Sequence, residues 1–322
     1  MRSSAYSPGP SIVDATYHSM EEINEISRAI GREGEFRQMS KGLVTSQWRW
    51  LRLEEFSLTS HRVDKRIHAR MSPPKGCVAM AIMAAPCSIL VDGREFGSNQ
   101  VLVADGNSQS DFVSLGENTC YTFILPESVF TPCQQALVPG MSMSEVGTSI
   151  RQCSSSEWSV LHTEVASLLR NGNASPEDLS HLLGRFVSLI AREPEGRQEK
   201  AYLGNKSSYF VARRAQEYIE DHYSETIRIE DLCRCTGMSM RTIQRSFSEY
   251  FQMSPLEYIK ARRLGAARQA LLASDASRDS VTQIALANGF THLGRFAVDY
   301  RKHFDESPRE TFALTNKMGR TG

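Results

Sequence analysis

Residues 232–239 read LCRCTGMS and lead into a longer stretch, residues 240–251, that reads MRTIQRSFSEYF. A second copy of the pattern reads IALANGFT at residues 284–291 and HLGRFAVDYRKHF at residues 292–304, and its glycine lies 52 residues after the first. Each copy predicts a short helix, a tight turn at the glycine and a second amphipathic helix. The chain is therefore expected to contain two helix-turn-helix units, whose second helices can enter DNA major grooves.

The second helix of the first copy has an apolar and a polar face. Ser239 stands where an N-cap residue accepts a backbone hydrogen bond. The apolar residues recur at helical spacing and are Met240, Ile243, Phe247, Tyr250 and Phe251. Arginine and glutamine on the opposite face can pair with guanine and adenine edges. The residues of this helix that we expect to contact DNA are Arg241, Thr242, Gln244, Arg245 and Ser248.

The second helix of the second copy has fewer hydrogen-bonding groups on its outer face. Its expected buried stripe is Leu293, Phe296, Tyr300 and Phe304. Outside that stripe, Val298 can only touch a thymine methyl, and Asp299 would be repelled by phosphates unless it accepts from cytosine. The residues expected to contact DNA are His292, Arg295, Val298, Arg301 and Lys302. We predict that the first helix supplies most base readout, whereas Arg295, Arg301 and Lys302 chiefly anchor the DNA backbone.

Composition and charge agree with a DNA-binding domain attached to another domain. The 322 residues exceed the ~250 that a single core usually supports. The formal net charge of zero conceals +4 over residues 206–322 and −4 over residues 1–205. The longest apolar run, residues 77–85, is far shorter than the ~20 residues of a membrane helix. Seven scattered cysteines indicate a reducing compartment, so we expect a soluble cytoplasmic protein without membrane contact.

The composition and the spacing of apolar residues divide the chain into four segments. Residues 1–42 are polar and predict an N-terminal arm with one helix. Residues 43–130 contain short apolar or alternating runs separated by turn signals, which predict a β-rich, cupin-like barrel or sandwich. Residues 131–205 predict a helical connector, and residues 206–322 an all-α domain that holds both helix-turn-helix motifs. The expected fold class is therefore α+β with two domains.

Two features of the first half leave alternatives open. Helical periodicity over residues 156–191 predicts a hairpin whose apolar stripes either form a dimer contact or pack on the β-rich domain. A charged linker is expected over residues 193–208. The β-rich domain is either fully packed or encloses a ligand cavity. Its expected lining is Val78, Met80, Ile82, Ile89, Val91, Val101, Val103, Phe123 and Leu125.

Residues 209–312 follow one family pattern from end to end. The matching positions are Gly237 to Ser239, Ile243 to Phe247, Ser254 to Tyr258, Arg263, Leu264, Ala267, Ile284, Ala285, Gly289, Phe290, Phe296, Tyr300 to Lys302, Phe304, Ser307 and Pro308. In this order they resemble the AraC/XylS family of bacterial transcription regulators, and residues 289–297 resemble its XylS and ethanolamine-regulator branch. The resemblance implies binding to promoter DNA, RNA polymerase as a partner, an activating role, and an N-terminal domain for small-molecule sensing or homodimerisation.

An alternative interpretation is a cupin-type metal enzyme fused to a DNA-binding domain. His61 and His68 lie in the β-rich segment, but no His-x-His with a following glutamate accompanies them. No phosphate-binding glycine-rich loop and no nucleophile elbow are present in the sequence. We therefore expect no catalytic residues, no metal and no cofactor, and we predict a regulator rather than an enzyme.

Overall fold

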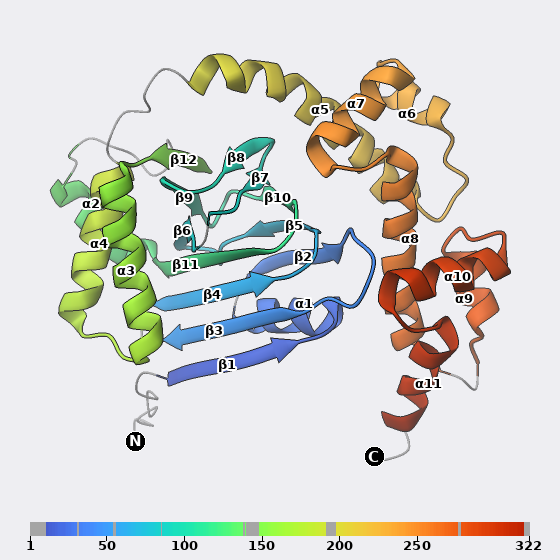
Figure 1. The fold of residues 1–322 in the computed structure, drawn as a ribbon, viewed down its shortest axis with the longest axis horizontal. Coiled ribbons are helices and arrows are strands. Elements are labelled where there is room, and N and C mark those ends of the chain that lie inside the picture. The colour runs from blue at the N-terminus through green and yellow to red at the C-terminus, as the bar shows by residue number, and fades with distance from the viewer. Residues whose placement is uncertain are drawn as a thin grey trace, which may run out of the picture.

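The chain folds into a sheet-rich first half and an all-helical second half (Figure 1). The computed structural model describes residues 11–30, 32–53, 56–84, 86–137, 139, 148–190, 198–275 and 278–318. Within these ranges, no helix is long and apolar enough to cross a membrane. The α+β fold class predicted from the sequence, with both helix-turn-helix motifs in the helical half, is confirmed.

Two antiparallel sheets make up the first half. The seven-stranded sheet has the order β1-β3-β4-β11-β6-β9-β12, and the five-stranded sheet has the order β2-β5-β10-β7-β8. The strands of the larger sheet are β1 (Ser11–Tyr17), β3 (Ser46–Arg52), β4 (Ser57–Val63), β6 (Cys77–Met83), β9 (Gln100–Asp105), β11 (Asn118–Pro126) and β12 (Ser149–Gln152). Those of the smaller sheet are β2 (Glu33–Gln38), β5 (Ile67–Ser72), β7 (Ile89–Val91), β8 (Arg94–Phe96) and β10 (Ser110–Ser114).

Helices cover the larger sheet and form the whole of the second half (Figure 1). Those of the first half are α1 (Met20–Ala29), α2 (Glu127–Leu137), α3 (Ser155–Asn171) and α4 (Pro176–Ile190). Those of the helical domain are α5 (Gln198–His222), α6 (Ile229–Thr236), α7 (Met240–Phe251), α8 (Pro255–Leu272), α9 (Val281–Ala287), α10 (Leu293–Phe304) and α11 (Pro308–Met318).

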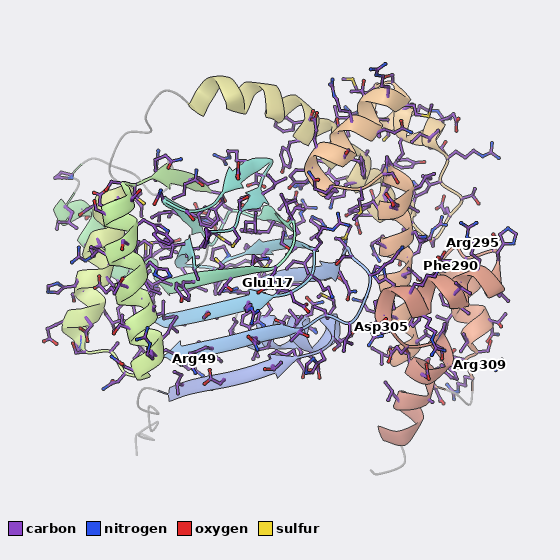
Figure 2. The ribbon with its side chains drawn as sticks, in the orientation of Figure 1. Arg49, Glu117, Phe290, Arg295, Asp305 and Arg309 are labelled. Atoms are coloured by element: carbon purple, nitrogen blue, oxygen red, sulfur yellow. The ribbon has the colours of Figure 1, made fainter. Side chains whose placement is uncertain are left out.

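β1 and β2 belong to the two sheets, and α1 packs against β2, where the sequence predicts an arm over residues 1–42. β1 pairs with β3 along its whole length, and Arg49 of β3, which Figure 2 labels, donates to Asp14 at 2.6 Å. β2 pairs with β5, and α1 lies against β2 with Ile23 buried. The prediction missed β1 because an edge strand keeps much of its surface in water and can therefore carry a polar sequence. The first ten residues of the predicted arm lie outside the described residues.

Helix α5 begins at Gln198, inside the linker that the sequence predicts over residues 193–208. Residues 193–197 lie outside the described residues. Glutamine, glutamate and lysine are good helix formers, so the charged character of this stretch does not exclude a helix. The helical domain therefore starts earlier than expected.

The helical hairpin predicted over residues 156–191 is present as α3 and α4. A capping box at Ser154 begins α3, and Gly172 ends it in the left-handed conformation. The apolar stripes of the hairpin, which include Leu161 and Phe186, are buried in one core with the larger sheet. The sequence left open whether these stripes form a dimer contact or pack on the β-rich domain. In the structure they pack on the β-rich domain.

Most residues expected to line the barrel face the helices instead. Seven of the nine pack in the core that includes α3 and α4: Val78, Met80, Ile82, Val101, Val103, Phe123 and Leu125. The expectation was wrong for these seven because β6, β9 and the end of β11 carry buried residues on both faces, so apolar character alone does not say which face points inward. The alternate residues Ala79, Ala81 and Ala104 face a cavity between the two sheets, where their small side chains leave space.

The five-stranded sheet separates this cavity from the helical domain. Successive side chains of a strand point to opposite faces, and β2, β5 and β10 each use both faces. The cavity face includes Phe36, Ala69 and Phe112. The opposite face contacts the helical domain through Arg37, His68 and Asp111. One sheet therefore forms a wall shared by the cavity and the helical domain.

A buried carboxylate holds the centre of this contact. Asp111 is fully buried and pairs with Arg213 of α5 and, at 3.2 Å, with His68. Burial by itself would raise the pKa of Asp111, but the hydrogen bond with His68 and the nearby charge of Arg213 hold that pKa below its ordinary value. The His68 ring also meets the Tyr258 hydroxyl of α8 at 3.3 Å. The helical domain thus supplies the counter-charge that a carboxylate of the sheet requires.

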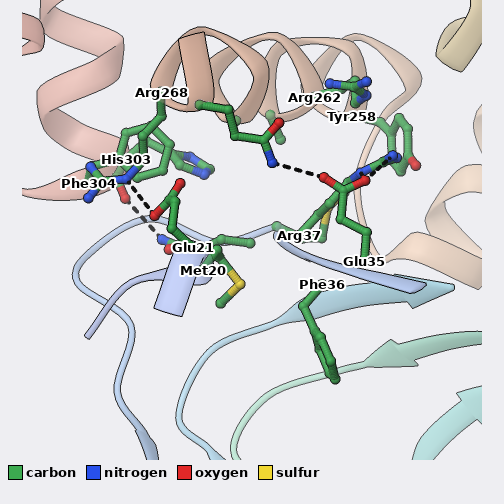
Figure 3. Close-up of a pocket in the computed structure, with 15 residues that line it drawn as sticks. Met20, Glu21, Glu35, Phe36, Arg37, Tyr258, Arg262, Arg268, His303 and Phe304 are labelled. Atoms are coloured by element: carbon green, nitrogen blue, oxygen red, sulfur yellow. Dashed lines mark hydrogen bonds and ion pairs between the residues drawn. The ribbon is translucent and has the colours of Figure 1, made fainter. Parts of the chain in front are cut away.

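A second group of polar contacts joins β2 and α1 to α5 and α8; those with α8 are drawn in Figure 3. Glu35 accepts from Gln269 at 3.0 Å, and Arg37 pairs with Glu220 of α5 at 2.5 Å. Glu21 of α1 pairs with Arg268 at 3.1 Å. Figure 3 shows Phe36 pointing away from α8, whereas its neighbours Glu35 and Arg37 lie on the side of the helical domain. The side chains of β2 therefore alternate between the cavity and the helical domain.

The two turn glycines of the repeated pattern differ in their surroundings. Gly237 has φ +70°, and a Cβ added there would meet nothing within 4 Å. Gly289 has φ +78°, and a Cβ would lie 2.9 Å from the carbonyl oxygen of Ser224 and 3.0 Å from the Arg263 guanidinium. Both need the left-handed conformation that glycine adopts freely, but only Gly289 also lacks space for a side chain.

We predict that Gly289→Ala destabilises the protein more than Gly237→Ala. Gly237→Ala should lower the free energy of unfolding by about 1–2 kcal/mol, since only backbone strain opposes it. Gly289→Ala adds a steric clash with backbone. The measurement is urea unfolding followed by circular dichroism. Gly265→Ala is the control, because its Cβ meets nothing within 4 Å and alanine favours the interior of α8 by about 1 kcal/mol. Equal losses for the Gly237 and Gly289 variants would contradict the prediction.

Candidate nucleic-acid interface

The first helix-turn-helix consists of α6 and α7. Gly237 ends α6 in the left-handed conformation, and the Ser239 hydroxyl accepts from the Thr242 backbone at the start of α7. The predicted cap is therefore confirmed. The apolar stripe is buried at Ile243, Phe247, Tyr250 and Phe251. Met240 was expected in that stripe but is 49% exposed, because it lies in the first turn, beyond the core that α5 and α8 form with α7.

The outer face of α7 is polar and accessible. Arg241, Gln244, Arg245 and Ser248 are exposed, as the sequence predicts. Arg245 lies 3.7 Å from Glu249, and an exposed pair of this kind is weak enough to release the guanidinium to a base. Thr242 is half-buried, and its hydroxyl lies 2.9 Å from that of Ser239, so it stabilises the helix start. The N-terminal half leaves this face uncovered.

The second helix-turn-helix consists of α9 and α10. Phe296, Tyr300 and Phe304 are buried in a core with α8, as expected. Leu293 was also expected in this stripe but is 38% exposed. It is the first residue of α10, and the preceding His292 makes no side-chain capping bond. The exposed positions of the predicted contact set are His292, Arg295, Val298, Arg301 and Lys302, and Figure 2 shows Arg295 on the side remote from the sheets.

Asp299 is neutralised within the helical domain. Its carboxylate lies 3.5 Å from the Lys260 ammonium of α8 and 3.9 Å from Arg295, and its side chain is 20% exposed. From the sequence we expect phosphates to repel Asp299 unless it accepts from cytosine; the pairing with Lys260 is not predictable there, because the two residues belong to different helices. With Lys260 as a partner, the charge of Asp299 opposes an approaching phosphate much less.

Helix α8 connects the two motifs. A capping box at Ser254 and a proline at the first position begin α8, as the sequence predicts. Its first part packs Tyr258 and Ile259 in the core of the first motif, and its second part packs Leu264 and Leu271 in the core of the second. Because one continuous helix belongs to both cores, it fixes the positions of the two recognition helices relative to each other.

Arg263 of α8 fixes the same relation through hydrogen bonds. Its guanidinium donates to the carbonyl oxygens of Tyr223 at 2.6 Å, Glu225 at 2.5 Å and Gly289 at 3.0 Å. Tyr223 and Glu225 follow α5, whereas Gly289 forms the turn of the second motif. In the sequence, Arg263 is only one position of the family pattern. Its contacts tie the loop between α5 and α6, which leads into the first motif, to the turn of the second motif.

The histidines of the β-rich half are engaged in the fold. The His61 ring lies 2.9 Å from the Ser46 hydroxyl and stacks on Trp48, and His68 is bonded to Asp111. Among the described residues, no three histidine, cysteine, aspartate or glutamate side chains gather closely enough to hold a metal ion. Neither histidine therefore has a neighbouring set of ligands within this part of the chain.

Known proteins similar to this chain share its helical domain. Residues 232–313 match the family described as "Helix-turn-helix domain". The chain is 35% identical over 100 residues to the "Probable thc operon regulatory protein" of Rhodococcus erythropolis, matching 31% of this chain and 30% of that protein. It is 36% identical over 101 residues to the "XylDLEGF operon transcriptional activator 2" of Pseudomonas putida, matching 31% of this chain and 64% of that protein.

Among solved structures, a probable AraC family transcriptional regulator from Rhodopseudomonas palustris is 39% identical over 33% of this chain and 97% of its own, with a TM-score of 0.31. The chain spans less than two thirds of the length of the two curated relatives, and the family match covers the segment that forms both helix-turn-helix motifs. By this domain, the chain belongs to the AraC/XylS family of transcriptional regulators.

Proposed function

We propose that this protein is a sequence-specific DNA-binding transcription regulator that activates its promoter together with RNA polymerase. The observation that carries the proposal is the pair of exposed polar helix faces, on α7 and α10, held in a fixed relation by α8. Two recognition helices on one rigid unit suit successive major-groove segments, about 34 Å apart on one face of the duplex. The activator names of the Pseudomonas putida relatives support the direction of regulation.

The two faces divide the work of recognition in this proposal. On α7, Arg241, Gln244 and Arg245 offer bidentate hydrogen bonds to base edges. On α10, Val298 is 54% exposed and offers only an apolar contact. Arg295, Arg301 and Lys302 provide charge for the phosphates. The first motif would therefore carry sequence discrimination, and the second would add affinity that depends on salt.

The N-terminal half is proposed to sense a small molecule. The cavity between the sheets offers a place for a ligand, and the five-stranded sheet shares its opposite face with the helical domain. A ligand alters DNA binding only if it binds the competent and incompetent arrangements with different affinity. Such a ligand could act on the helical domain through the five-stranded sheet. A strand that it displaced would move residues bonded to α5 and α8.

We predict different effects for Arg245→Ala and Arg295→Ala on DNA binding. The operator is first obtained by selection from random duplexes, and affinities are then measured for it and for a scrambled site. Arg245→Ala should reduce the preference for the operator by about 10-fold or more, since a bidentate base contact is worth ~1–3 kcal/mol of discrimination. Arg295→Ala should weaken binding to both duplexes alike and lower the salt dependence by about one phosphate contact.

The control for these variants is Arg309→Ala, which removes an exposed arginine of α11 outside both predicted contact sets. It should change neither affinity nor preference appreciably. An equal loss of preference in the Arg245 and Arg295 variants would refute the division of work. Absence of any selected operator would refute the proposed function itself.

Homodimerisation is a further part of the proposal. Because the inward stripes of α3 and α4 are buried, a dimer contact at the hairpin has to use its outer side, where Val160 is 45% exposed. Sedimentation of the full chain at micromolar concentration should show a dimer, and Val160→Asp should shift it toward monomer. Ser159→Asp, a neighbouring surface change, serves as the control. A wild-type monomer throughout the concentration range would count against this part.

A further inference from the structure

The turn of the second motif lies directly against the loop that leads into the first. Residues 223–225 begin this loop, which joins α5 to α6, and Gly289 forms the turn between α9 and α10. A Cβ added to Gly289 would lie 2.9 Å from the carbonyl oxygen of Ser224, so the two backbones pack without a side chain between them. Within the described residues, α5, α6 and α7 make no extensive contact with α9, α10 or α11. The seam between residues 223–225 and Gly289 therefore joins the two motifs directly, in addition to α8.

The guanidinium of Arg263 closes this seam with a separate nitrogen for each acceptor. Nε donates to the carbonyl oxygen of Tyr223 at 2.6 Å, Nη2 to that of Glu225 at 2.5 Å, and Nη1 to that of Gly289 at 3.0 Å. Because the guanidinium is planar and rigid, its nitrogens fix the separations of the three carbonyl oxygens. Hydrogen bonds from a charged donor are also short and strong. The turn of the second motif therefore cannot shift along the loop without breaking one of these bonds.

The apolar cores hold the motifs on α8 less strictly than these hydrogen bonds do. α8 extends from the first motif to the second (Figure 1), and Ile259 packs in one core and Leu271 in the other. Apolar contact is non-directional, so it stabilises each motif on α8 over a range of small displacements. A hydrogen bond weakens steeply when its length or angle leaves a narrow range. The fork of Arg263 therefore supplies a precision that the two cores lack.

The size of one base-pair step shows how much precision two half-sites require. Successive pairs of B-DNA lie ~3.4 Å apart and are rotated by about 35°, since one turn of ~34–36 Å contains ~10–10.5 pairs. A half-site that moves by one pair requires α10 to move by about the same distance relative to α7. The hydrogen bonds of Arg263 are between 2.5 and 3.0 Å long, and bonds of this kind allow changes of only about 0.5 Å. A shift by one base pair therefore breaks them.

We propose that Arg263 is a positioning residue that sets the spacing between the two half-sites of the operator. It acts through Gly289, which forms the turn before α10, and through the end of α5, which packs with α7 in one core. In this role Arg263 selects for spacing rather than for bases. A duplex that contains both half-sites with the wrong number of base pairs between them is then bound by only one motif at a time. This inference deepens the proposed function and rests on it, because it requires a protein that binds two half-sites.

The test varies the spacing for the full-length wild-type protein and two variants. The operator is selected from random duplexes, its half-sites are located by single substitutions, and one base pair is then inserted or removed between them. Fluorescence anisotropy gives the affinities for the three duplexes. The wild-type protein should bind each altered duplex at least about tenfold more weakly, whereas Arg263→Met should bind all three to within about threefold. Arg263→Lys should also relax the preference, because one ammonium replaces three separate donor nitrogens.

Arg262→Met is the matched control for these variants. Arg262 precedes Arg263 in α8 and contacts the same loop, with its guanidinium 3.9 Å from the centre of the Tyr223 ring, and it pairs with Glu220 at 2.7 Å. Both partners lie at the end of α5, on the side of the first motif. Arg262→Met should therefore keep the spacing preference of the wild-type protein, whatever its melting temperature. An equal relaxation in the Arg262 and Arg263 variants would indicate a loosened loop and overturn the proposal.

The failure of this proposal is distinguishable from the failure of the proposed function. Absence of any selected operator refutes the regulatory function and this inference together. An operator with a single half-site, or equal wild-type binding at all three spacings, refutes only the spacing role of Arg263. The same holds if Arg263→Met loses affinity by one common factor on all three duplexes, since general destabilisation has that effect. If Arg263→Met does not fold, as circular dichroism reports, Arg263→Lys decides the proposal by the same three affinities.

Discussion

The five-stranded sheet must satisfy a different environment on each of its faces, and the arrangement of the rest of the molecule follows from this. Along β2, β5 and β10, one set of alternate residues faces the cavity, and the other set faces the helical domain. A strand cannot rotate one face without rotating the other, because the side-chain period is fixed at two. The cavity and the helical domain are thus coupled by the geometry of the strand itself.

The two faces of the five-stranded sheet differ in whether a buried charged side chain has a partner. On the side of the helical domain, Asp111 is fully buried but meets Arg213 and His68, so its charge is compensated across the domain contact. On the cavity side, Arg32 is 8% exposed, and its buried Nη2 atom has no hydrogen-bond partner among the described residues. The first arrangement holds the two domains together, because removing either partner would leave a buried charge unpaired. The second places a charged side chain at the wall of the cavity.

The two helix-turn-helix motifs share a scaffold but differ in what their exposed faces offer. Both turns need a left-handed glycine, and both second helices bury three or more aromatic or aliphatic side chains. α7 exposes arginine and glutamine, whereas α10 exposes Val298 and has its one carboxylate paired with Lys260. The common helix α8 and the three hydrogen bonds of Arg263 make these unequal faces parts of one rigid unit.

The sequence by itself determined the elements whose cause is local. Helical periodicity, the caps at Ser239 and Ser254 and the turn glycines all depend on residues a few positions apart, and the structure has them where they were expected. Only the tertiary structure decided which face of a doubly buried strand points inward, that β1 joins a sheet, and that Lys260 and Arg263 stabilise the second motif. It also decided that, within the described part of the chain, the buried Nη2 atom of Arg32 has no hydrogen-bond partner, because whether such a group is paired depends on side chains that distant parts of the chain bring to it.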